Sequence, residues 1–200
     1  MATERAARRL LVVAGIAILV AVGSAMIPRV SAMREGMRGL RADESTRAQR
    51  HFYDLSRAAF NAARSPTSAG LIMGKAPAEE LSKIAKSFSW DTEYGNAVHY
   101  SHLVIGRIAL HRGDLEGAKS HLLEAGKAPS SPQLAAFGPD MTLAQELLAR
   151  GESAAVLEYL AECEKLWSAR PDPLNEWEMA IRSNAIPDFG RHSGLSRAGA

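Results

Sequence analysis

Apolar and polar residues divide the chain into an uncharged N-terminal run and a longer region with helical periodicity. The run covers residues 10–27, LLVVAGIAILVAVGSAMI, and contains no charged side chain. At about 1.5 Å of rise per residue, a helix of this length reaches roughly 27 Å, close to the hydrocarbon thickness of a bilayer. It also lacks the polar stripe of a core helix, so it predicts a segment inserted in a membrane.

The residues on either side of this run indicate whether it is cleaved or retained and how it is oriented in the membrane. A basic tail, residues 1–9, precedes a predicted transmembrane helix or signal anchor at residues 10–28, and Val30–Ala32 offers a signal-peptidase-like site. The length of the run favours a retained anchor over a cleaved signal peptide. Arginines on both sides leave the positive-inside rule undecided, but a short basic tail before a first apolar segment is typical of a signal anchor. We therefore expect the C-terminal domain on the exported side, with secretion after cleavage as the alternative.

Beyond residue 42, apolar residues recur every three or four positions. This spacing predicts a long helix over residues 42–64, a break at 65–70 and a second helix over 77–88 that has Pro77 in its first turn. A closing helix is expected within residues 171–190, between prolines at both ends. Residues 191–200 are rich in Gly and Ser and predict a disordered tail.

Two segments in the middle of the chain repeat each other at a distance of 38 residues. Both read as a helix, a short turn and a second helix, with approximate bounds 95–128 and 133–167. The shift places Gly113 on Gly151 and Ile105 on Leu143, among other pairs. The two segments are therefore interpreted as copies of one helical hairpin.

The first copy resembles the tetratricopeptide repeat, a helix–turn–helix family. Its match rests on seven positions, while His102 and Ala109 replace the family's usual aromatic residues. Gly151 marks the same turn in the second copy. The resemblance implies paired helices in close contact, and a concave face formed by the leading helices that binds peptides or partner helices. The matching residues are Ile105, Gly106, Gly113, Asp114, Ala118, Leu122 and Ala125.

These patterns predict an all-α protein: a short helical-hairpin solenoid, tetratricopeptide-like, preceded by one transmembrane helix. The domain would occupy residues 43–190, and residues 29–42 would form a basic juxtamembrane linker that could lie against anionic headgroups or act as a solvated spacer. The whole arrangement also resembles bacterial membrane-anchored helical-repeat proteins.

Composition and charge narrow the functional classes. The 200 residues are 46% apolar and 23% charged, enough for one modest core. A single cysteine, Cys163, excludes an intramolecular disulfide or a multi-cysteine zinc site, and it is expected to be a buried, inert thiol. Residues 1–41 hold seven Arg and two Glu, whereas the remainder holds 17 basic and 20 acidic residues. Because the folded part carries no basic excess, we expect no nucleic-acid partner.

Candidate chemistry is sparse. His99 and His102 share a helical face but have no evident third ligand, so no metal site, cofactor or catalytic residue is predicted. Arg112-Gly113-Asp114 is interpreted as a hairpin turn in which Asp114 caps the next helix.

The expected function is therefore that of a non-catalytic, membrane-anchored interaction module or scaffold that binds a protein or peptide. The residues proposed to contact the partner are Tyr94, Tyr100, His102 and Trp177, and the alternative for Trp177 is packing in the core. Two other functions stay open: a structural subunit of an envelope complex, or an enzyme that uses His99, His102 and Glu93.

Overall fold

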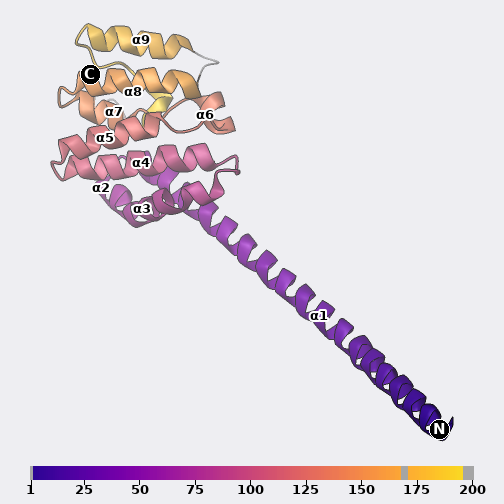
Figure 1. The fold of residues 1–200 in the computed structure, drawn as a ribbon. Helices are drawn as coiled ribbons and strands as arrows, with labels where there is room; N and C mark the ends of the chain where they lie inside the picture. The colour runs from indigo at the N-terminus through magenta and orange to yellow at the C-terminus, as the bar shows by residue number, and fades with distance from the viewer. Residues whose placement is uncertain (1, 168–170, 196–200) are drawn as a thin grey trace. The chain divides into compact units, whose positions relative to one another are not determined.

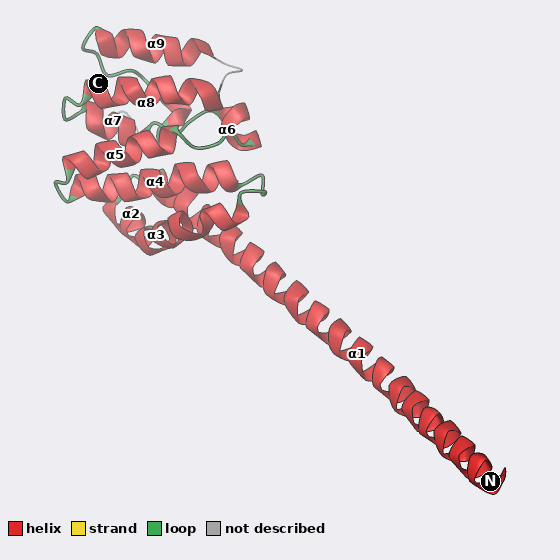
Figure 2. Ribbon diagram, in the orientation of Figure 1, coloured by secondary structure: helices red, strands yellow, loops and turns green. Residues whose placement is uncertain are grey.

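The computed structural model describes the backbone of residues 2–167 and 171–195, and the side chains of 33–167 and 172–195. Throughout these residues the regular structure is helical, and no strand is present (Figure 2), which confirms the predicted all-α class. The chain forms two compact units, Met1–Gln49 and Arg50–Ala200. The second unit contains the predicted domain except for its first residues, 43–49.

The first helix, α1, is longer than predicted and runs from Ala2 to Ala63. It continues through Pro28 and through the predicted linker at 29–42, where Ala, Arg, Met and Leu are good helix formers and Arg47 pairs with Asp43 one turn away. The predicted span at 10–27 lies outside the residues whose side chains are described. Among those that are described, no helix is both long enough and apolar enough to cross a membrane.

Three short helical elements follow α1. They are α2 (Ser68–Met73), α3 (Lys75–Ile84) and a 3₁₀ turn, η1 (Ala85–Phe88). The predicted break at 65–70 already contains the start of α2, because the Thr67 hydroxyl caps it by accepting from Gly70 N–H at 3.1 Å. Pro77 lies in the first turn of α3, as predicted.

The first predicted hairpin is confirmed as α4 (Tyr94–His111) and α5 (Leu115–Gly126). Gly113 adopts a φ of +84°, and the Asp114 carboxylate accepts from Gly117 N–H at 2.9 Å, so the turn and the cap are as expected. A Cβ atom on Gly106 would lie 2.6 Å from Leu143 Cδ2. Gly106 therefore allows the helices to pack closely.

The second hairpin differs from the prediction in its leading helix, which is broken into α6 (Pro132–Phe137) and α7 (Thr142–Leu148) before α8 (Ser153–Leu166). Gly138 has a φ of +80° and Pro139 cannot donate a backbone hydrogen bond, so the helix cannot continue through them. The turn itself repeats the first one. Gly151 has a φ of +85°, and Glu152 N–H donates to Leu147 O at 3.1 Å.

The closing helix, α9 (Pro171–Arg182), ends in a turn of the same form at Asn184, whose φ is +61°. The chain then returns to the domain through η2 (Gly190–His192). His192 O accepts from Met141 N–H at 2.6 Å, and Thr142 Oγ1 accepts from Gly194 N–H at 2.9 Å. The prediction of disorder is thus wrong for residues 191–195, while residues 196–200 lie outside the described part.

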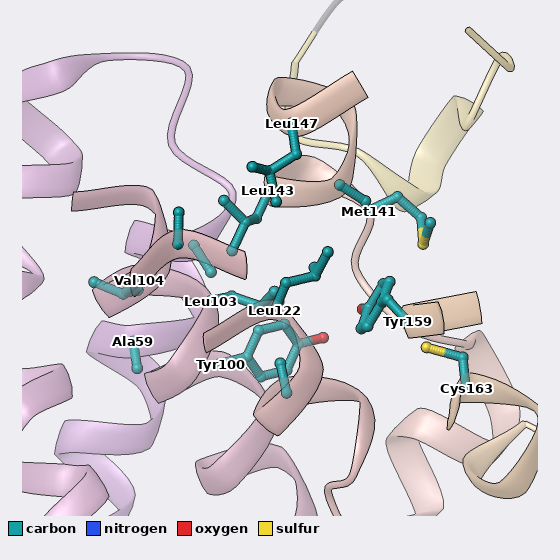
Figure 3. Close-up of a cluster of buried hydrophobic side chains, with 14 of the residues drawn as sticks. Ala59, Tyr100, Leu103, Val104, Leu122, Met141, Leu143, Leu147, Tyr159 and Cys163 are labelled. Carbon is teal, nitrogen blue, oxygen red and sulfur yellow. The ribbon is translucent and has the colours of Figure 1, made fainter. Parts of the chain in front are cut away.

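In the second unit, α4, α5, α8 and α9 lie one above the next (Figure 1). The core fills the space between these helices and the end of α1, with α7 contributing Leu143 and Leu147 (Figure 3). Three of the predicted repeat positions, Ala118, Leu122 and Ala125, are fully buried in it, whereas Ile105 is partly buried.

Candidate interaction groove

The loop between α6 and α7 joins several helices through one buried carboxylate, Asp140. Its Oδ1 accepts from Thr142 N–H at 2.9 Å, and its Oδ2 lies 2.5 Å from Nη1 of Arg64 at the end of α1. Its backbone carbonyl accepts from the Tyr159 hydroxyl of α8 at 2.9 Å. Burial raises the pKa of the Asp140 carboxyl, although hydrogen bonds and Arg64 oppose this effect. The loop is therefore fixed from three sides.

His99 on α4 belongs to the same buried network. Asp140 N–H donates to His99 Nε2 at 3.1 Å, so the other ring nitrogen, Nδ1, carries the proton and donates to Ala125 O at 3.0 Å. Burial lowers the pKa of His99 from its ordinary value of 6.5 to about 4. Both ring nitrogens are engaged, so His99 is a neutral core histidine with no free position for a metal or a proton transfer.

Beside this network, two adjoining hollows form a groove. The larger has a volume of about 600 Å³ and the smaller about 310 Å³. They share Phe60, Tyr100 and Gln133, so α1, α4 and α6 all contribute to both. The remaining lining residues are Tyr53, Ser56, Arg57, Thr92 and Glu93 in the larger hollow and Arg64, Phe137, Gly138, Pro139, Arg191 and His192 in the smaller.

Aromatic residues line both hollows of the groove: Phe60 and Tyr100 are shared, Tyr53 lines the larger hollow and Phe137 the smaller. Phe60 and Tyr100 meet edge to face with centroids 4.9 Å apart. Tyr100 is buried, and this burial raises the pKa of its phenol. Tyr53 in the larger hollow is 40% exposed, and Phe137 in the smaller is 60% exposed. The groove thus offers apolar area to a ligand at both ends.

Arginines outnumber carboxylates on the groove wall. Arg57, Arg64 and Arg191 line it together with a single acid, Glu93, whose Oε2 accepts from Asn96 Nδ2 at 2.9 Å. Arg64 is neutralised by buried Asp140, and Arg57 pairs at 2.8 Å with Asp54 on the exposed surface. An exposed pair of this kind is weak and can exchange partners at small cost.

One polar atom of the groove wall has no partner. The Ser56 hydroxyl is buried and, within the described part of the chain, forms no hydrogen bond. An unsatisfied buried hydroxyl costs about 1–3 kcal/mol relative to a bonded one. A ligand group that reached it would recover part of this free energy.

Of the four residues predicted to contact a partner, only Tyr100 lines the groove. Tyr94 packs half-buried against the core. His102 faces α5, where its Nδ1 lies 2.9 Å from Nδ1 of His121, and burial lowers the pKa of both imidazoles. Trp177 is only 6% exposed because Trp167, Phe189 and His192 surround it, which is the core packing that the sequence analysis gave as the alternative for this residue.

The prediction missed the contribution of α1. The apolar spacing over residues 42–64 was used only to predict a helix, yet residues 53, 57, 60 and 64 follow the spacing of one helical face and carry Tyr, Arg, Phe and Arg. This aromatic and basic stripe is the signal that could have located the groove.

The remaining candidate chemistry is buried or dispersed. Cys163 is buried, and burial raises the pKa of its thiol, as expected for an inert residue. His102 and Glu93 bond to different neighbours, so the structure does not assemble the alternative site with His99. Among the described side chains, no group of three or more His, Cys, Asp or Glu could hold a metal ion.

Comparisons with known proteins add no identification. No protein-family model, no curated protein and no solved structure matches the chain.

Proposed function

We propose that this chain is a membrane-anchored, tetratricopeptide-like interaction module whose groove binds an extended segment of a partner protein. The observation that carries the proposal is the groove lined by Tyr53, Phe60, Tyr100 and Phe137 on a helical scaffold. Concave, largely apolar surfaces with a few polar groups are the usual form of ligand sites. Exposed aromatic side chains give a partner large contact area at low cost in conformational entropy.

The polar groups of the groove favour a polypeptide over a compact apolar ligand. Gln133 lines both hollows, the unpartnered Ser56 hydroxyl and Arg57 line the larger one, and Arg64 and Arg191 line the smaller one. A peptide backbone presents donors and acceptors at regular intervals, so it can reach several of these groups while its side chains cover the rings.

Two further features support the module and its anchor. The hairpin turns at Gly113 and Gly151 have the same backbone form and lie 38 residues apart, as stacked helical hairpins require. The uncharged run at 10–27 has the length of a bilayer span. An anchor would hold the groove near membrane partners and raise its effective concentration there. We place the domain on the exported side, with secretion as the alternative.

The test is a selection from a random peptide library on immobilised residues 43–200. We expect selected peptides to share a motif and to bind more weakly when Tyr53 and Phe137 are both replaced by Ala. The matched control replaces Ile72 and Met179, which are exposed apolar residues outside the groove. Loss of binding in the control alone, or no selected peptide, would count against the groove as the binding site.

A further inference from the structure

Residues 33–41 of α1 carry two parallel stripes on the helix surface. Met33, Met37 and Leu40 are 67%, 44% and 67% exposed and follow each other at intervals of four and three residues. Three arginines, Arg34, Arg38 and Arg41, repeat the same spacing one position later and are also exposed. Because successive residues are about 100° apart around a helix, an apolar stripe lies directly beside a basic one.

The basic stripe is not neutralised within the described residues. None of its three arginines pairs with a carboxylate there, and Glu35 is the only acid in the segment. By contrast, Arg47 pairs with Asp43 at 2.5 Å farther along α1. The segment thus combines exposed apolar area with uncompensated positive charge.

A second copy of the same helix is a poor occupant for this surface. The interval of four and three residues fits a coiled-coil seam, but Arg34 would then flank the seam. In a parallel pair it would face Arg29 of the other helix. This contact between like charges is unfavourable, whereas an anionic surface with an apolar interior complements both stripes.

We propose that residues 33–41 bind the anionic headgroups of the membrane in which the chain is anchored, with Arg34, Arg38 and Arg41 on phosphates and the Met and Leu side chains in the interface. The proposal rests on the anchoring part of the proposed function. Arg34 follows Ile27 by seven residues, about 10 Å of helix. The headgroup layer and one Debye length reach roughly 13–15 Å beyond the hydrocarbon, and a tilt of the helix brings the later residues closer.

The experiment uses the full chain in vesicles, with a fluorescent label on Met37→Cys. Cys163 is buried and does not compete for the label. Vesicles of phosphatidylcholine alone are compared with vesicles that also contain phosphatidylglycerol, and the neutral quencher acrylamide reports exposure. A label on Ser45→Cys, also exposed but beyond the basic stripe, is the positional control.

We expect acrylamide quenching at residue 37 to fall by about half in the anionic vesicles, because one side of the helix faces lipid. High salt, or the combined substitution of Arg34, Arg38 and Arg41 by Gln, should abolish the difference. The matched control replaces Arg112, Arg150 and Arg182 by Gln. This removes the same charge from the exposed surface of the domain and should leave the difference in quenching between the two lipids unchanged.

The outcomes that overturn the inference are distinct from those that overturn the anchor. Equal quenching in both lipids by a chain that floats with the vesicles contradicts headgroup binding and leaves the anchor standing. A chain that floats with neither vesicle contradicts both. Rapid disulfide formation between two copies of Met37→Cys, equal in both lipids, would assign the stripe to a second copy.

Discussion

At the scale of single residues, Arg107 on α4 holds together parts of the chain that are far apart in sequence. It is 2% exposed, and its guanidinium donates to Ala63 O at 3.0 Å and Ser65 O at 2.9 Å at the end of α1. It also pairs with Glu146 of α7 at 2.6 Å. One side chain therefore satisfies carbonyls that the helix end leaves free and fixes α7 beside them.

Replacing Arg107 by Met should lower the free energy of unfolding by about 3–5 kcal/mol, because Glu146, whose side chain is only 11% exposed, loses its arginine partner and keeps only His111 nearby, at 3.4 Å. Urea unfolding of residues 43–200, followed by circular dichroism, measures this loss. Adding Glu146→Leu should restore only part of it, since the carbonyls of α1 remain unpaired. A cost below about 1 kcal/mol for the single substitution would show that the network does not hold the helices together.

His99 predicts a dependence of stability on pH. Its pKa is about 4 in the folded chain and near 6.5 when unfolded, so the unfolded state binds more protons between these values. The contribution of His99 is therefore complete above pH 6.5 and is lost as pH falls towards 4, by about 3 kcal/mol. His102 and His121, whose pKa values are also lowered, act in the same direction.

The free energy of unfolding, measured across this pH range in the wild type and in His99→Gln, separates the contribution of His99 from those of the other titrating groups, such as His102 and His121. The difference between the two proteins should shrink as the solution is acidified. A constant difference would mean that His99 has the same pKa in the folded and unfolded states, contrary to its burial and its hydrogen bonds with Asp140 and Ala125.

Sequence reasoning succeeded for residues whose role is local and failed for those whose role depends on tertiary contacts. Asp114 as a cap and Gly113 in the turn follow from neighbours within a few residues. The burial of Trp177 depends on Phe189 and His192, which reach it only because the chain turns back after α9. The spacing of Leu174, Trp177 and Ile181 on one face of α9 favours burial of that face, but it does not identify the segment that covers it.

At the scale of elements, three turns share one backbone form. Residues 113, 151 and 184 have φ values of +84°, +85° and +61°, and each is followed by a residue whose N–H donates to a carbonyl five residues earlier. Glycine occupies the first two positions and Asn the third. The turns at residues 113 and 151, which are 38 residues apart in the sequence repeat, therefore have the same hydrogen-bond pattern. No family model supports the resemblance to the tetratricopeptide repeat.

This shared form predicts matched effects of substitution. Gly113→Ala and Gly151→Ala should each cost about 1 kcal/mol through the positive φ alone, because no atom lies within 4 Å of the added Cβ at either site. Asn184→Gly should be neutral or slightly stabilising. Thermal unfolding of the three variants measures these shifts, and a large cost at only one of the two glycines would show that the turns are not equivalent.

The break between α6 and α7 was not predicted, because glycine adopts both helical and left-handed backbone conformations and the sequence does not show which of them Gly138 takes. Its backbone was decided by the loop, where Asp140 binds partners on α1, α4 and α8. At Pro28 the error is in the other direction. Proline predicted the end of a helix, but α1 continues through it because good helix formers lie on both sides.

At the scale of the whole molecule, the groove is built from segments that the sequence separates widely. Residues 53–64, 92–100, 133–139 and 191–192 meet only after the helices have packed. Periodicity could therefore predict the all-α class and the hairpins, but the predicted partner contacts lay on α4 and, with Trp177, on α9. The end of α1 and the C-terminal return, neither of which was expected to take part, supply all three arginines that line the groove.

The most direct test of the proposed function is site-specific photo-crosslinking of the full chain in its own cells. A photoreactive side chain at Tyr53 or Phe137 should give the same discrete adduct with another protein, because both positions border the groove. The same group at Ile72 or Met179, exposed elsewhere, should give none. Adducts at the control positions but not in the groove would contradict the account.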